Sequence, residues 1–343
     1  MKYIAPNWLP GGNLQTIWPA VVSARALVQT PATAYQRVRW TTPDHDFVDV
    51  DYAGAGAGAA DAVAVADSPP FRQKRPLLVL FHGLEGSSGS HYALAFEQVA
   101  RQRGWAYAVP HFRGCSGEIN RAPRAYHSGD YEEIGWMLGK LKAGHVANGG
   151  GPLLAVGISL GGNALMRWAQ EAGETAAHTV AAVASVCSPL DLAASGRAIG
   201  QGFNRLVYTR MFLNTMKPKA MARLKLNPGL FDPHALLASR DLYAFDNVFT
   251  APVHGFKNTE DYWLRASAKP HMHRIKLPAL ALNAINDPFI PALSLPQLDE
   301  VSRHVTLWHT PHGGHVGYPQ GRFPAQVKAM PEAVAAWLAG HIP

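Results

Sequence analysis

Residues 153–163 read Leu-Leu-Ala-Val-Gly-Ile-Ser-Leu-Gly-Gly-Asn, and this stretch decides the fold. An apolar run reaches Gly157, Ser159 follows two residues later, and Gly161 opens a segment with helical spacing. A serine on a sharp turn between a strand and a helix needs glycine two positions before and after it, because side chains there would collide. The G-x-S-x-G pattern therefore predicts a strand, a tight turn and a helix, with Ser159 exposed at the turn as a candidate nucleophile.

The surroundings of this motif carry more weight than its five positions. With the glycine and serine frequencies of this chain, G-x-S-x-G arises by accident in roughly one sequence in eight. Here an apolar run comes directly before the motif, and Ala164, Leu165 and Trp168 lie on one face of the helix expected after it. An accidental match around an inert serine would lack both neighbours.

Apolar runs and helical patterns alternate on both sides of the motif. Residues 90–103 and the segment from about residue 130 have the spacing of helices, and a final helix is expected near Pro331. Such alternation predicts an α/β fold, with a mainly parallel sheet between helices and a hairpin before it at residues 36–42 and 47–52. The runs that predict the other strands are residues 76–81, 105–110, 153–157, 180–187, 278–283 and 305–309.

The 343 residues are enough for one large α/β domain with an insertion. The alternation stops over residues 191–276, where helical fragments mix with turn residues, so a helical lid or cap insertion is expected there. The core is then residues 35–190 and 277–343. Residues 1–34 are expected to be an N-terminal arm that packs its tryptophans on the domain surface, and the Ala- and Gly-rich residues 53–70 a surface loop.

Composition and charge limit the class of protein. The chain is 48% hydrophobic and 16% charged, which is typical of a substantial buried core. Its net charge of +7 comes from scattered lysines and arginines, so nucleic acid is not expected as a partner. Two cysteines, Cys115 and Cys187, are too few for a disulfide framework. The sequence shows no signal peptide and no membrane-spanning run, so a cytoplasmic protein is expected, while contact with a membrane surface and the oligomeric state stay open.

An activated serine needs a histidine within hydrogen-bond reach and a carboxylate that holds this histidine in the correct tautomer. After a strand-turn-helix nucleophile, the expected order along the chain is Ser, then Asp or Glu, then His. Ser159, Asp287 and His315 supply that order. Each lies just past an expected strand, so all three are expected at one edge of the parallel sheet.

Other residues compete for the roles of nucleophile and acid. Ser116 has no glycines placed as the turn requires, so Ser159 is favoured over it. Asp191 also follows an expected strand. Asp287 is favoured because it stands directly past a strand and before Pro288, where a loop begins.

Three histidines, His309, His312 and His315, compete for the role of base. His315 is favoured because Gly313 and Gly314 let the backbone of its loop approach closely. Neither this three-residue spacing nor the pair at positions 271 and 273 matches a helical metal-ligand motif with an acidic partner. No metal site is therefore expected.

Negative charge that develops on a substrate carbonyl oxygen needs hydrogen-bond donors fixed in advance. The backbone amide of Leu160, at the start of the helix, is one candidate. The amide of Leu84 is the other, because Gly83 and Gly86 let the loop after the strand at 76–81 run close to a substrate.

Taken together, the motifs of the chain resemble the α/β-hydrolase fold, and within it the YheT-like hydrolases of bacteria and their eukaryotic relatives among the abhydrolase-domain lipid esterases. In such families the serine, the aspartate of Asp-Pro-Phe and the second histidine of His-Gly-Gly-His form the triad, which corresponds to Ser159, Asp287 and His315. The resemblance implies hydrolysis of carboxylic esters, with medium-chain or lipid esters in some relatives. The matching stretches are residues 13–16, 82–86, 111–118, 126–129, 157–163, 286–289 and 312–317.

Three hypotheses about function follow from the sequence. The leading hypothesis is a serine carboxylesterase that needs no cofactor and cleaves short- to medium-chain acyl or lipid esters through an acyl-enzyme on Ser159. The second is an acyltransferase that passes the same acyl group to an alcohol or thiol. The third is a non-catalytic binding protein with an inert serine turn.

Overall fold

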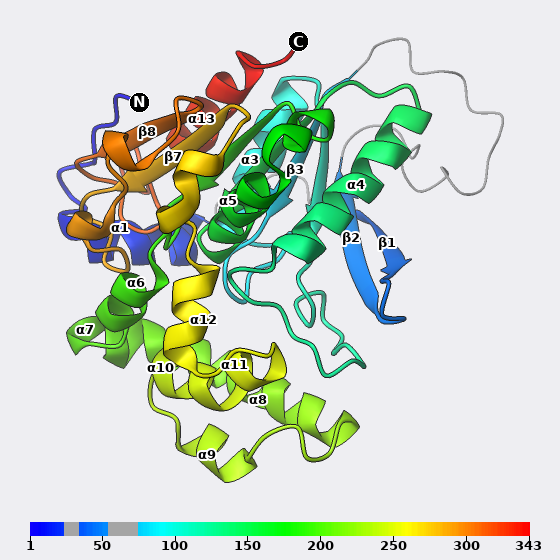
Figure 1. Ribbon diagram of the computed structural model, residues 1–343. Coiled ribbons are helices and arrows are strands. Elements are labelled where there is room, and N and C mark those ends of the chain that lie inside the picture. Colours follow the sequence, from blue (N-terminus) through cyan, green and yellow to red (C-terminus); the bar gives the residue numbers. More distant parts are fainter. Residues whose placement is uncertain (24–33, 54–74) are drawn as a thin grey trace.

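The computed structural model describes residues 1–23, 34–53 and 75–343, and an eight-stranded sheet forms the centre of these ranges (Figure 1). The strands are β1 (Gln36–Thr41), β2 (Phe47–Ala53), β3 (Leu77–Phe81), β4 (Ala106–Pro110), β5 (Leu153–Ile158), β6 (Ala182–Val186), β7 (Ala279–Ala284) and β8 (Val305–Thr310). Their order across the sheet is β1-β2-β4-β3-β5-β6-β7-β8. The hairpin β1-β2 joins β4 in antiparallel fashion, and all pairs from β4 to β8 are parallel. The mainly parallel sheet that the sequence predicts is confirmed.

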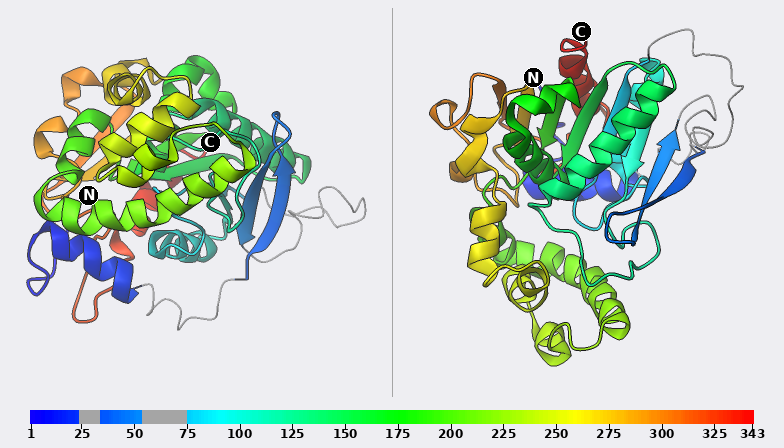
Figure 2. Two further views of the ribbon diagram at one scale, coloured as in Figure 1. Left: turned by 90° about the horizontal axis from the view of Figure 1, so that it is seen from below. Right: turned by 45° about the vertical axis from the view of Figure 1, so that its right-hand side comes forward.

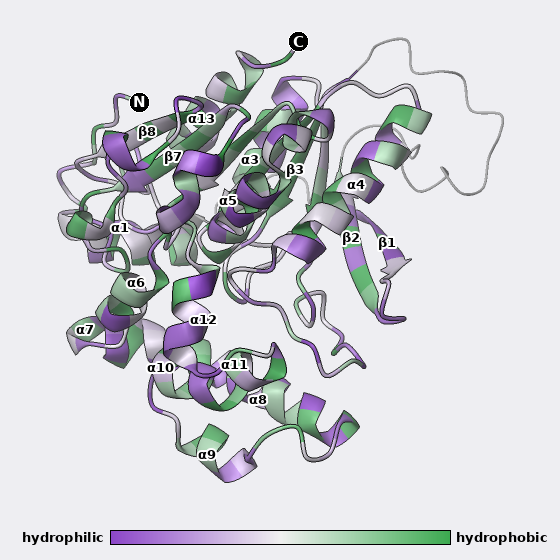
Figure 3. Ribbon diagram, viewed as in Figure 1, coloured by the Kyte–Doolittle hydropathy of each residue, from purple (hydrophilic) through white to green (hydrophobic). Residues whose placement is uncertain are grey.

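Helices cover both faces of the sheet. On one face lie α4 (Tyr131–Ala147) and α5 (Leu160–Ala172), and on the other lie α3 (His91–Gln102) and α13 (Ala329–Ala339). Every residue of β3, β5, β6 and β7 is buried. Strands covered on both sides need apolar side chains on both sides, which explains the apolar sequences of β3 and β5. β6 and β7 are also apolar except for the buried Ser185 and Asn283. Figure 3 shows the hydrophobic colour concentrated in these strands and mixed with hydrophilic colour on the outer helices.

The hairpin is tied to the sheet by charged groups. Arg113, in the loop after β4, donates to Asp44 at the hairpin turn and to Glu133 on α4, at 2.8 and 2.7 Å. His111 contacts Asp51 on β2 at 2.8 Å. The arginine is buried and fully paired, as a charge in the interior must be.

A group of helices follows β6 and precedes β7 in the chain, and it lies beyond the carboxyl ends of the strands (Figures 1 and 2). This helical insertion has its own small core around Leu213, Leu236 and Phe249. The residues that follow it, 268–277, instead pack into the core on the α4 and α5 face. Its helices are α6 (Leu192–Ile199), α7 (Gly202–Asn204), α8 (Arg210–Leu226), α9 (Pro233–Ala238), α10 (Leu242–Phe245), α11 (Ala251–Val253) and α12 (Thr259–Ala266).

The N-terminal residues contain a helix that the sequence pattern does not predict, α1 (Gly11–Trp18), followed by a π-helical turn at Pro19–Ser23. Trp8 and Trp18 pack against Phe323, with ring centroids 5.5 and 5.6 Å away. The loop expected at residues 53–70 lies, from residue 54 on, outside the described residues. Within the described ranges, no helix combines the length and the apolar character that crossing a membrane requires.

Candidate active site

The turn between β5 and α5 holds Ser159 in a strained conformation, with φ 52° and ψ −120°. A non-glycine residue with positive φ at such a turn is unusual and marks a candidate functional position. A Cβ atom on Gly157 would lie 2.4 Å from the Cα of Gly162, and one on Gly161 would lie 2.4 Å from the carbonyl oxygen of His82. The motif therefore needs glycine at both positions, because a side chain there would collide with neighbouring backbone atoms.

Ser159, His315 and Asp287 meet at the carboxyl edge of the sheet. The Nδ1 of His315 donates to Oδ2 of Asp287 at 2.9 Å, and the hydroxyl of Ser159 donates to Nε2 of His315 at 3.0 Å. Oδ1 of Asp287 accepts from the N–H of Phe289 at 2.8 Å. The side chain of Asp287 is fully buried and that of His315 is 11% exposed. A buried carboxylate can thus fix the imidazole tautomer whose Nε2 accepts the serine proton.

The competing residues lie outside this hydrogen-bonded group. The hydroxyl of Ser116 donates to Asp49 at 2.7 Å, and Asp191 caps α6 by accepting from the N–H of Ala194 at 2.9 Å. His309 belongs to β8, and His312 is exposed, with its Nδ1 3.5 Å from Asn286. Of these candidates, only the three residues that the sequence favours contact one another.

The turn after β3 brings Leu84 to the same place. The N–H groups of Gly83 and Glu85 donate to the hydroxyls of Tyr92 and Tyr126 at 3.0 Å, whereas the N–H of Leu84 between them has no partner among the described residues. Leu84 and Leu160 both line the pocket that contains Ser159. The amide of Leu84 is therefore a candidate donor to an oxygen bound in this pocket.

His82 holds this turn against the neighbouring loop. Its Nδ1 donates to the carbonyl of Gly83 at 2.8 Å, and its Nε2 accepts from the N–H of Phe112 at 3.1 Å. Complete burial lowers the pKa of His82 to about 3. The ring is therefore neutral and acts as a structural donor and acceptor, which its sequence position beside Gly83 does not reveal.

Asn163, the last residue of the quoted stretch, connects α5 to two other segments. Its Nδ2 donates to the carbonyls of Ser128 and Ala266 at 2.9 and 2.8 Å, and its Oδ1 accepts from the N–H of Ala268 at 3.0 Å. Asn163 is completely buried. The helix behind Ser159 is thus bonded to the loop before α4 and to the end of α12.

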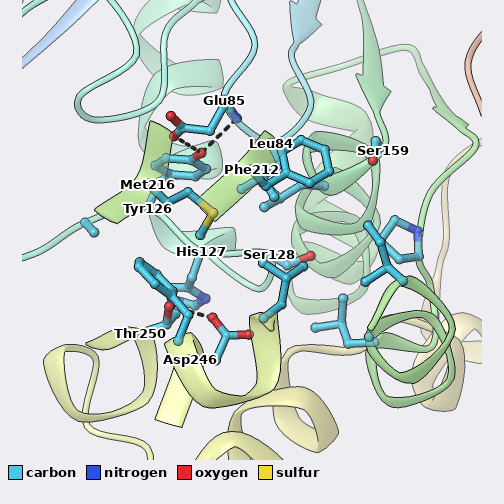
Figure 4. Close-up of a pocket in the computed structure, with 18 of the residues that line it drawn as sticks. Leu84, Glu85, Tyr126, His127, Ser128, Ser159, Phe212, Met216, Asp246 and Thr250 are labelled. Carbon is cyan, nitrogen blue, oxygen red and sulfur yellow. Dashed lines mark hydrogen bonds between the residues drawn. The ribbon is translucent and has the colours of Figure 1, made fainter. Parts of the chain in front are cut away.

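The insertion forms most of a pocket over Ser159 and His315. The pocket encloses about 1150 Å³, open solvent at its mouth included. Phe212 and Met216 from α8 and Phe245 and Phe249 from the following helices make its walls largely apolar. Figure 4 shows Phe212 between Ser159 and Glu85. Such a space suits the apolar part of a small ligand.

A carboxylate lies at the far side of this pocket. Asp246 accepts from the indole N–H of Trp263 at 2.9 Å and from the hydroxyl of Thr250 at 2.7 Å (Figure 4). Burial raises the pKa of Asp246 to about 6. In the described ranges, no group of three His, Cys, Asp or Glu side chains could hold a metal ion.

Gln15 and Thr16 of α1 contact the loops that hold Asp287 and His315. The sequence pattern does not predict these contacts. The buried Gln15 accepts, through Oε1, from the side chain of Asn286 and from the N–H of Gly313, both at 2.9 Å. The hydroxyl of Thr16 accepts from the N–H of His315 at 2.8 Å. The available signal was the Asn-Leu-Gln-Thr stretch at residues 13–16, which is one of the stretches that carry the family resemblance.

A protein-family model described as alpha/beta hydrolase fold matches residues 76–321. The chain belongs to this family. A protein of Escherichia coli (strain K12) named YheT, a candidate esterase by its name, is 35% identical to this α/β-hydrolase over 345 residues, covering 99% of this chain and 94% of its own. The family that the sequence motifs resemble is therefore confirmed.

More distant relatives are eukaryotic. Phospholipase ABHD3 of Mus musculus is 26% identical, over 75% of this chain and 61% of its own length. Monoacylglycerol lipase of Saccharomyces cerevisiae is 27% identical, over 72% of this chain and 56% of its own length. This α/β-hydrolase thus spans less than two thirds of either relative.

Solved structures agree in fold. The esterase Pf2001 of Pyrococcus furiosus superposes with a TM-score of 0.54 at 14% identity, covering 100% of this chain and 99% of its own. Mouse alpha/beta hydrolase domain-containing protein 10 has a TM-score of 0.52 at 14% identity, over 89% and 99% of the two chains. At such low identity the likeness concerns the fold alone.

Proposed function

We propose that this α/β-hydrolase is a serine carboxylesterase. The observation that carries the proposal is the hydrogen-bonded line from Asp287 through His315 to Ser159, with links of 2.9 and 3.0 Å. A serine hydroxyl bonded to a neutral imidazole, itself held by a buried carboxylate, is the arrangement that makes an alcohol nucleophilic at neutral pH.

The reaction follows from these contacts. His315 takes the proton of Ser159 as its oxygen attacks the ester carbonyl, and Asp287 stabilises the imidazolium that forms. His315 then gives the proton to the leaving alcohol as the carbon–oxygen bond of the ester breaks, which leaves an acyl group on Ser159. Water, activated by His315 in the same way, adds to the acyl carbon and releases the acid.

Backbone amides are proposed to hold the carbonyl oxygen as it becomes negative. The N–H of Leu84 has no partner among the described residues, and Leu160 lies at the N-terminus of α5, where the helix dipole favours negative charge. Loss of one such donor costs on the order of a hundredfold in turnover in enzymes of this kind.

The pocket supports a substrate with an apolar acyl part. Phe212, Met216 and Phe249 face the space beside Ser159, so short- to medium-chain acyl esters or lipid esters fit the proposal. Relatives named phospholipase and monoacylglycerol lipase agree with it. We also propose that the helical insertion, which falls within the expected residues 191–276, acts as a cap that excludes water from the acyl-enzyme.

A covalent probe and an ester panel test the proposal. A fluorophosphonate is expected to label the protein, and Ser159→Ala is expected to abolish both the labelling and the hydrolysis of p-nitrophenyl esters. Ser116→Ala is the matched control and should keep both, because the Ser116 hydroxyl donates to Asp49 and not to a histidine. A folded wild-type protein that is neither labelled nor active would contradict the proposal.

The same panel separates hydrolysis from transfer. If added alcohols or thiols capture the acyl group faster than water does, the chain is an acyltransferase with the same Ser159 intermediate. If folded protein binds esters of every chain length without turning them over, it is a binding protein.

A further inference from the structure

The outer side of one long helix in the insertion is apolar although it faces solvent. Residues 202–226 are helical throughout, as α7, a π-helical turn at Arg205–Thr209 and α8. On it, Phe203, Leu206, Val207 and Met211 are 51%, 73%, 37% and 52% exposed. Their spacing places them on one face of the helix. We call these four residues the outer stripe.

The inner side of the same helix is already used. Tyr208 and Leu213 are buried, and Phe212 and Met216 line the pocket over Ser159. A surface helix with one partner needs only one apolar stripe, and its opposite face is ordinarily polar. Four large apolar side chains on the free face therefore indicate a second partner for this helix.

The charge of this part of the chain indicates what kind of partner. Residues 192–231 contain seven lysines and arginines and no aspartate or glutamate. Arg205, Arg210 and Lys225 on the helix are exposed, and no acidic side chain pairs with them among the described residues. An apolar face with unpaired cations beside it is the pattern of a helix that lies in the interface of an anionic bilayer.

We propose that the outer stripe docks this protein on an anionic lipid surface. Phe203, Leu206, Val207 and Met211 enter the boundary between headgroups and acyl chains, while Arg205 and Arg210 stay at the level of the anionic headgroups. The helix then has lipid on its outer side and the pocket over Ser159 on its inner side. Figure 2, left, shows this helix in yellow-green lying across the side of the molecule that lies away from the sheet.

This surface deepens the proposed function, because an esterase held in this way meets its apolar substrates at the bilayer. The docking itself rests on the helix alone. It can therefore be tested with Ser159→Ala, which binds without consuming lipid, so that failure of docking and failure of catalysis are seen separately.

Vesicle flotation tests the docking. Ser159→Ala protein is mixed with vesicles of pure phosphatidylcholine or of phosphatidylcholine with phosphatidylglycerol, at low and at high salt. We expect binding to the anionic vesicles, weak binding to the neutral ones, and loss of most binding at about 1 M salt, where charges are screened beyond about 3 Å.

Variants assign the binding to the stripe. The pair Phe203→Ser and Leu206→Ser is expected to weaken binding by about tenfold for each removed side chain. Arg205→Gln and Arg210→Gln are expected to weaken it by about fivefold each, and only for anionic vesicles. Leu293→Ser is the matched control, since Leu293 is 99% exposed outside the stripe and should bind like the parent protein.

Each result of these experiments either supports or overturns the docking proposal. Absence of vesicle binding, equal binding to neutral and anionic vesicles, or unchanged binding of the stripe variants overturns the docking proposal. Self-association through the stripe without vesicle binding would assign the face to a second copy of the chain. Melting temperatures near that of the parent show that the variants are folded. Hydrolysis of soluble esters by the wild type without vesicle binding would remove the docking proposal and leave the esterase proposal intact. Vesicle binding without hydrolysis of any ester would leave the docking proposal intact and remove the esterase proposal.

Discussion

The backbone nitrogen of His315 donates to the hydroxyl of Thr16, 2.8 Å away and 299 positions earlier in the sequence. That hydroxyl donates its own proton to the carbonyl of Gly12 at 2.7 Å, so its lone pairs face the histidine loop. Gly313 and Gly314 in this loop have φ of 150° and 61°, which only glycine adopts readily. A loop with such freedom needs external bonds to hold its imidazole, and Gln15 and Thr16 provide them.

Thr16→Val keeps the shape of the side chain and removes the acceptor. We expect kcat on a soluble p-nitrophenyl ester to fall by about ten- to a hundredfold, because small displacements of a catalytic group are costly, while KM changes little. Thr16→Ser keeps the hydroxyl and should restore most of kcat. Steady-state kinetics and the rate of fluorophosphonate labelling measure both effects.

A control variant shows whether a loss of stability alone lowers kcat. Asp232→Ala removes the cap of α9, none of whose residues lines the pocket over Ser159, and should lower the free energy of unfolding by about 1 kcal/mol with kcat unchanged. Equal kcat in Thr16→Val, Thr16→Ser and wild type would refute a positioning role for Thr16.

At the scale of elements, the helix after the nucleophile is pressed against the turn after β3. A Cβ on Gly161 would lie 2.4 Å from the carbonyl oxygen of His82 and 2.6 Å from that of Phe81, both of them backbone atoms that cannot easily move. The amide of Leu84 belongs to this turn. The distance between the serine turn and its proposed oxyanion donors therefore depends on the absence of one methyl group.

Gly161→Ala is expected to lower both the melting temperature and kcat, since α5 must move away from the turn. Gly139→Ala is the matched control on α4, where a Cβ meets nothing within 4 Å. That change should raise the free energy of unfolding by about 0.5–1 kcal/mol, because alanine favours helix, and leave kcat unchanged. Urea denaturation and ester hydrolysis are measured on both variants. If Gly161→Ala behaved like Gly139→Ala, close packing of α5 on the turn after β3 would not require glycine at position 161.

The strands could be predicted from the sequence because a strand covered on both faces must be apolar at every position. β3 and β5 satisfy this rule, and β7 departs from it only at the buried Asn283. The chain order of Ser, Asp and His gives the three residues that meet at the sheet edge. Their catalytic roles stay a prediction. The Leu84 and Leu160 amides are likewise predicted oxyanion donors.

Helix α1 could not be predicted in the same way. It has eight residues and begins with two glycines, so its own preference for helix is weak. It forms because Gln15 and Thr16 bond to loops almost three hundred residues later, and contacts at that separation leave no period in the local sequence. The helical spacing of the outer stripe predicts packing residues, whereas the structure leaves them exposed, because helical spacing alone does not tell a packed face from an exposed one.

For the molecule as a whole, the buried carboxylate of Asp246 makes stability depend on pH. Burial raises the pKa of Asp246 to about 6, above the ordinary value of 3.8 that it has in the unfolded chain. Between these values the folded protein binds a proton that the unfolded chain releases. The contribution of this group to stability is therefore full below about pH 4 and is lost as the pH rises through 6.

Asp246→Asn removes this titration while an amide oxygen and nitrogen still face Trp263 and Thr250. The free energy of unfolding of the variant, minus that of wild type, is expected to rise by about 3 kcal/mol between pH 3 and pH 7. Chemical denaturation at a series of pH values measures the difference, in which the other titrating groups cancel. A difference that stays constant with pH would show that the pKa of Asp246 is the same in the folded and the unfolded protein.

The bond between α1 and the histidine loop also has a consequence for biosynthesis. A ribosome that adds about 5–20 residues each second needs on the order of 15–60 s to travel from Thr16 to His315. Throughout that interval the emerging polypeptide lacks both the imidazole and the surface on which its first helix docks. The proposed triad can therefore assemble only after the Gly-Gly-His turn has been synthesised. A product cut short before that turn would lack the proposed base, however well its sheet had begun to form.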